Sequence, residues 1–186
     1  GLGDVYKRQN SDSMLNSKIE EALNAQINAE MWSAYFYLSM SAWCAQAGKP
    51  GMANWFEVQF REEQDHARIF FNYVLQRGGK VTLQPIDAVP TEWQSELDVF
   101  ESTLEHEQKV TSLINNLFAL TTQENDYATQ SMLKWFIDEQ VEEEENVRNI
   151  IDNLRMLNGN GYGLFMIDKE LAARVYTQAA PLAGNA

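Results

Sequence analysis

The chain has 186 residues, of which 45% are hydrophobic, and its 27 acidic and 14 basic residues give a net charge of −13. This length suits a single domain with a substantial buried core. The acidic surplus argues against nucleic acid and anionic membranes as partners, because both are negatively charged, and it favours cations as ligands. The single cysteine, Cys44, excludes an intramolecular disulfide and a Cys-x-x-Cys metal site.

Residues 1–13 are mostly polar and small, which is typical of a loop, so we expect a disordered leader before a domain that begins at Met14. The leader lacks the apolar core of a signal peptide, and no later segment reaches the roughly 18 uninterrupted apolar residues of a membrane span. We therefore predict a cytoplasmic protein with no membrane partner. Its domain occupies residues 14–177, and residues 178–186 form a flexible tail.

Two long helices are predicted in the first half of the domain. Apolar residues recur every three or four positions from residue 16 to about 45, and the sequence Gly-Lys-Pro-Gly at 48–51 ends this first helix. A second apolar stripe runs from Met52 to Gln76 and stops at Gly78 and Gly79. Both patterns are typical of amphipathic helices that pack against other helices.

The second half repeats this organisation after a long connection. Residues 80–93 contain two prolines and predict an extended crossover that makes the second and third helices parallel. The third helix begins near Ser95, the fourth follows a polar turn at 124–126 and breaks at 158–161, and residues 167–177 can form a short fifth helix. The sequence thus predicts an all-α, up-down-down-up four-helix bundle.

Each of the four apolar stripes contains a glutamate near its middle: Glu30, Glu63, Glu107 and Glu143. His66 follows Glu63 at a spacing of three, which places both side chains on one helix face. Unpaired buried carboxylates are costly, and several at one depth also repel each other. The pattern therefore predicts a buried metal site between the helices. Protonated or water-bridged carboxyl groups are the alternative.

The sequence resembles the ferroxidase centre of bacterial non-haem ferritins at these four glutamates, the Glu63-x-x-His66 pair, the run at 139–143 and Tyr37. The likeness extends from Met14 to about residue 177, and it includes residues 165–171, which resemble the fifth helix of that family. The resemblance implies one iron site at Glu30, Glu63 and His66. A second site would use Glu63 as a bridge together with Glu107 and Glu143.

The same resemblance assigns further residues. Gln140 would lie beside the second iron, and Tyr37 would adjoin the iron pair with a hydrogen-bonding or redox part. A third, weaker iron site would use Glu143 again with Glu62, Glu139 and Glu142. No haem is expected, because bacterioferritins place a second Glu-x-x-His on the fourth helix and a haem-binding methionine where this chain has Gln64.

Three neighbours of these acids are expected to point away from the core. His106 precedes Glu107 and is rotated about 100° from it on a helix, so we predict a surface histidine. Glu144 and Glu145 should likewise turn outward, whereas Glu142 and Glu143 lean toward the site.

The resemblance implies an iron-storage protein with ferroxidase activity. It would oxidise Fe(II) with dioxygen or hydrogen peroxide and hold ferric mineral in a homo-oligomeric shell. The resemblance implies that this shell has 24 subunits. Two alternatives remain open on the residues alone. The chain could be a di-iron oxidase or peroxidase that stores no iron, or a structural helical assembly with empty or protonated acids.

Overall fold

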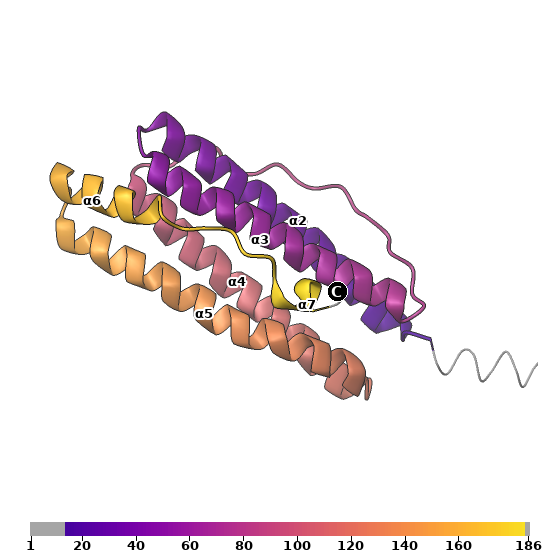
Figure 1. The fold of residues 1–186 in the computed structure, drawn as a ribbon. Coiled ribbons are helices and arrows are strands. Elements are labelled where there is room, and N and C mark those ends of the chain that lie inside the picture. The colour runs from indigo at the N-terminus through magenta and orange to yellow at the C-terminus, as the bar shows by residue number, and fades with distance from the viewer. Residues whose placement is uncertain (1–13, 185–186) are drawn as a thin grey trace, which may run out of the picture.

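The computed structural model describes residues 14–184, and the predicted leader at 1–13 lies outside this range. Four long helices form the bundle in Figure 1: α2 (Ser17–Gln46), α3 (Pro50–Gln76), α4 (Glu96–Gln123) and α5 (Tyr127–Leu157). Two short helices follow, α6 (Gly161–Leu171) and α7 (Ala180–Ala183). Residues 14–184 contain no β-strand, which confirms the prediction of an all-α bundle.

Local sequence signals set the ends of the long helices. The side chains of Asn16, Ser95 and Asp126 accept hydrogen bonds from backbone N–H groups in the first turns of α2, α4 and α5. These side chains satisfy donors that have no partner within a helix. Asn158 adopts a left-handed conformation with φ of 46° directly after α5 and lets the chain turn.

The connection between α3 and α4 runs along the outer side of α2, so α3 and α4 point in the same direction (Figure 1). Polar side chains of α2 hold the backbone of this connection in place. Asn24 accepts from the Thr82 N–H at 2.8 Å, and the hydroxyl of Ser39 donates to the Pro90 carbonyl at 2.7 Å. The predicted long crossover is therefore confirmed.

The core consists of two apolar clusters. One contains Tyr37, Phe56, Phe100 and Val147, and the other contains Leu23, Ile27, Phe70, Ile114 and Phe136. In each long helix, the glutamate of the apolar stripe lies between residues of one cluster and residues of the other. The fold thus confines a polar layer between two apolar halves of one bundle.

The fifth helix differs from its predicted range of 167–177. It starts at Gly161, because the Asn160 side chain accepts the Gly163 N–H at 2.9 Å and caps a new helix immediately after the break. It ends at Leu171, where Asn54 of α3 donates to the Leu171 and Ala172 carbonyl groups. The chain is then extended to α7.

The described part of the predicted flexible tail, residues 178–184, contains the short helix α7. Pro181 lies at the start of α7, where its fixed φ suits the first turn of a helix. Leu182 packs against the apolar cluster that contains Leu23 and Phe70. Of the helices within residues 14–184, none is long and apolar enough to cross a membrane.

Candidate metal centre

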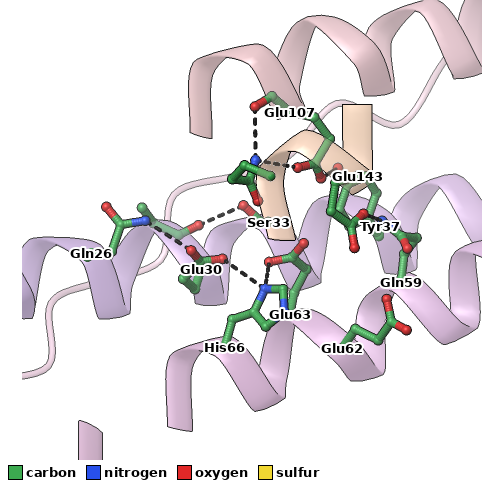
Figure 2. A network of polar contacts seen from close by, with 12 residues as sticks. Gln26, Glu30, Ser33, Tyr37, Gln59, Glu62, Glu63, His66, Glu107 and Glu143 are labelled. Carbon is green, nitrogen blue, oxygen red and sulfur yellow. Dashed lines mark hydrogen bonds and ion pairs between the residues drawn. The ribbon is translucent and has the colours of Figure 1, made fainter. Parts of the chain in front are cut away.

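Glu30 of α2 and the Glu63–His66 pair of α3 form the first half of a buried site. Their side chains point toward one another (Figure 2), and one ligand atom from each lies within 4.8 Å of the others. Their exposed fractions are 1%, 2% and 3%. The i, i+3 spacing on α3 and the close packing of α2 on α3 bring the three side chains together.

One oxygen of this cluster has no hydrogen-bond partner. Gln26 Nε2 donates to Glu30 Oε1 at 3.0 Å, and His66 Nδ1 lies 3.2 Å from Glu63 Oε2. Among the described residues, Glu30 Oε2 is buried and makes no hydrogen bond. A buried polar atom without a partner is costly, and a bound cation would satisfy it. The donor set of carboxylates and an imidazole fits a transition-metal ion such as iron.

Glu107 of α4 and Glu143 of α5 form the second half, and both are buried. Tyr37 donates its hydroxyl proton to Glu107 Oε1, and Gln140 Nε2 donates to Glu107 Oε2 at 3.1 Å. Gln59 Nε2 donates to Glu143 Oε2 at 3.1 Å. All three donors are neutral, so they orient the carboxylates without cancelling their charge.

Burial and mutual repulsion favour protonated carboxyl groups in the metal-free protein. Burial raises the pKa of Glu30 well above its ordinary value, and the neighbouring charge of Glu63 raises it further. Burial likewise raises the pKa of Glu63. Burial and the Glu143 charge raise the pKa of Glu107 to about 8. A metal ion that binds here must displace protons, so its affinity depends on pH.

A family model described as a ferritin-like domain matches residues 20–157 of the chain. The chain belongs to the ferritin family. A bacterial non-heme ferritin of Bacteroides fragilis is 41% identical over 161 residues, which cover 87% of this chain and 100% of the relative. A probable bacterial non-heme ferritin-like protein of Haemophilus influenzae is 41% identical over 158 residues, or 85% of this chain and 96% of that one.

Solved ferritin structures share the fold. The ferritin of Archaeoglobus fulgidus engineered into a closed form is 44% identical, with a TM-score of 0.87 over 88% of this chain and 99% of that chain. The open pore ferritin of the same archaeon is 43% identical, with a TM-score of 0.86 over 87% and 99%. The resemblance inferred from the glutamates is confirmed at the level of the family, which makes iron the expected metal.

The acids that this ferritin-family chain is expected to use at a third iron site differ in how deeply they are buried. Glu62 and Glu139 are half-buried, whereas Glu142 is exposed. Burial raises the pKa of Glu62 to about 7, although Arg174 forms an ion pair with it at 2.9 Å. Burial and the charge of Glu143 also raise the pKa of Glu139.

Glu144 is half-buried, contrary to the prediction that it turns outward. The Thr111 hydroxyl donates to Glu144 Oε2 at 2.7 Å, because this face of α5 packs on α4. Glu145 is exposed, as predicted.

The prediction of a surface position for His106 is also wrong. Its Nε2 lies 2.7 Å from Ser33 Oγ, and its ring centre lies 5.1 Å from that of Phe36. Burial, with a smaller effect of Lys109, lowers the pKa of His106 to about 4. Rotation by about 100° from Glu107 directs this side chain toward α2 instead of toward solvent.

The glutamines that orient the carboxylates received no role from sequence reasoning, apart from Gln140. Gln26 and Gln59 each lie one turn before a stripe glutamate, on the same helix face. An uncharged polar residue within an apolar stripe indicates that the amide has a buried hydrogen-bond partner. It does not reveal which carboxylate the amide contacts.

Proposed function

We propose that this protein is an iron-storage ferritin whose buried carboxylate–histidine centre oxidises Fe(II) with dioxygen or hydrogen peroxide. The observation that carries this proposal is the unpartnered Glu30 Oε2, which lies beside Glu63 and His66 in a chain of the ferritin family. Fe(II) is the substrate here. An oxygen-rich site with one imidazole suits Fe(II) and also the Fe(III) product.

Two iron positions account for the four stripe glutamates. In the proposal, Glu30, Glu63 and His66 bind the first Fe(II), and Glu63 bridges to a second Fe(II) held by Glu107 and Glu143. Four carboxylate charges balance two divalent cations, which resolves the repulsion that raises the pKa of Glu107. Tyr37 and Gln140 support Glu107 as hydrogen-bond donors and complete the centre.

We further propose that Glu62, Glu139, Glu142 and Glu143 hold a third, weaker iron. The half-burial of Glu62 and Glu139 supports this site, whereas exposed Glu142 would contribute only by reorienting its side chain. Because Glu62 pairs with Arg174 in the present structure, an ion at this site competes with an arginine. Such competition agrees with weak binding.

Storage requires assembly into a shell, which we propose has 24 copies. Three apolar side chains of α6 support burial between subunits, since Tyr162, Phe165 and Met166 are 74%, 56% and 42% exposed. Large apolar side chains gathered on one short helix are typical of contact surfaces. A cytoplasmic location stays a prediction.

Mass and iron content test the proposal together. The purified protein, loaded with Fe(II) in air and passed over a sizing column with light scattering, should elute as a large shell with many irons per subunit. A small oligomer with two irons per subunit would favour the non-storing oxidase. A protein that retains no iron and oxidises none would favour a structural assembly.

A further inference from the structure

The segment between α6 and α7, residues 172–179, lies against α3 (Figure 1). Two side chains of α3 hold it. Asn54 Nδ2 donates to the Arg174 carbonyl at 2.9 Å, and Asp65 Oδ2 accepts from the Tyr176 hydroxyl at 2.6 Å. Arg174 is itself one of these two attachment points, so its backbone position is fixed relative to α3.

The Arg174 side chain reaches from this segment toward the metal centre. Its guanidinium carbon lies 4.5 Å from the centre of the Trp55 ring, and its Nη1 donates to the Trp55 carbonyl at 3.1 Å. Its Nη2 donates to Gln59 Oε1 at 2.6 Å and to Glu62 Oε2 at 2.9 Å. These contacts fix the plane of the guanidinium group.

The contact with Arg174 decides which way the Gln59 amide points. A guanidinium group carries only donors, so it must face the amide oxygen. The amide nitrogen then faces Glu143 Oε2, which accepts its proton at 3.1 Å. A flipped amide would place two donors together on one side and two acceptors on the other. Gln59 is 1% exposed, so water cannot compensate for such a flip.

We propose that Arg174 is a positioning residue for the metal centre. Through Gln59 it holds the Glu143 carboxylate in the orientation that the second metal position needs. This inference rests on the proposed function, in which Glu143 is a ligand of that position. Among residues 14–184, no hydrogen bond or ion pair joins Glu30 or His66 to Arg174 or Gln59, so the first position should not depend on this chain of hydrogen bonds.

The test is a calorimetric titration of the metal-free assembled protein with Zn²⁺, a redox-inert probe. Wild type should show two tight binding steps per subunit. Arg174→Met keeps an aliphatic side chain on Trp55 but removes the donors, so the second step should weaken by about 10–100-fold, the usual effect of losing a group that orients a ligand. The first step should not change.

Two further variants separate positioning from other effects. Arg61→Met removes the cation–π contact of Arg61 with Tyr176, 4.2 Å from the ring centre, and so loosens the same segment without touching Gln59. It should bind Zn²⁺ as wild type does. Gln59→Met keeps the Arg174–Glu62 pair but breaks the link to Glu143. It should reproduce the Arg174→Met result, and the double variant should be no weaker than either single one.

The outcomes distinguish the inference from the proposed function. An unchanged or tighter second step in Arg174→Met would overturn the inference, because tighter binding would mean that Arg174 only competes with cations for Glu62. Equal weakening in Arg61→Met would also overturn it. Failure of wild type to bind two Zn²⁺ per subunit would instead contradict the proposed function. If Arg174→Met does not assemble, Gln59→Met decides the inference by the same readout.

Discussion

Glu30 Oε2 and His66 Nδ1 lie 3.8 Å apart across the contact between α2 and α3. This separation is too long for a hydrogen bond. It can be spanned by one metal ion bonded to both atoms at about 2.0–2.2 Å. The two side chains come from different helices, so their relationship depends on how α2 packs on α3.

Replacing Glu63 or His66 by alanine should abolish rapid Fe(II) oxidation and leave the assembly intact. Glu63 is proposed to contact both irons, and His66 supplies the only imidazole of the cluster. The rate, followed by the absorbance of Fe(III), should fall by at least about 10–100-fold, the range seen when even a group behind the ligands is lost. The control is Glu57→Ala, an exposed glutamate of the same helix. Wild-type rates in both site variants would refute the assignment.

Zinc should raise the melting temperature of the wild-type protein. Ligand that binds only the folded state at 100 times its Kd adds about 2.7 kcal/mol of stability. For a domain of this size that corresponds to a shift of roughly 5–11 °C. The shift, measured by calorimetry, should shrink in Glu30→Ala. Identical shifts in the two proteins would show that zinc binds elsewhere.

The metal-free protein should become less stable as the pH rises from about 5 to 8. Burial and the Glu143 charge raise the pKa of Glu107 from its ordinary 4.5 to about 8. Between these values the folded state binds a proton that the unfolded state has released, so the free energy of unfolding falls with rising pH. The Glu107→Gln variant has no titratable group at position 107. Over this pH range its unfolding free energy should fall by a few kcal/mol less than that of the wild type. Urea unfolding in the presence of a chelator measures both profiles. Parallel profiles would contradict a shifted Glu107.

Asp168→Ala should destabilise the protein by about 1–3 kcal/mol. This buried carboxylate of α6 accepts the N–H groups of Gly51 and Met52 at 3.1 and 2.8 Å, at the start of α3. Without it, two helix N-terminal donors are left without partners inside the protein. Glu170→Ala, an exposed neighbour on α6, is the control for thermal unfolding. Equal melting temperatures would show that water replaces the carboxylate.

Gly51→Ala should be more damaging than an ordinary glycine substitution. A Cβ atom at this position would lie 1.6 Å from the Asp168 carbonyl oxygen, which is backbone and cannot rotate away. We expect lower yield of folded protein and a lower melting temperature. Gly161→Ala is the matched control, because nothing lies within 4 Å of a Cβ there. Similar behaviour of the two variants would mean that α6 can shift away from α3.

The sequence alone determined the long helices and the buried acids. Helix ends depend on nearby residues, such as Ser95, which caps α4, and Asn158, which ends α5. The 3.6-residue period also shows which glutamates share a face with apolar residues. Both signals are local, so they can be recognised without knowledge of the packing. The same locality explains the error at the end of the fifth helix, which depends on Asn54 of α3, whereas its start at Gly161 follows the local cap by Asn160.

Only the tertiary structure decided which groups surround those acids. The His106 side chain points about 100° away from that of Glu107 on α4. Whether this direction leads to solvent depends on the neighbouring helix, and here His106 contacts Ser33 of α2. Arg174 and Gln59 are 115 positions apart, and the hydrogen bond between them exists because the segment after α6 folds back onto α3. Helix periodicity reports the direction of a side chain, whereas its partner is set by the packing of distant segments.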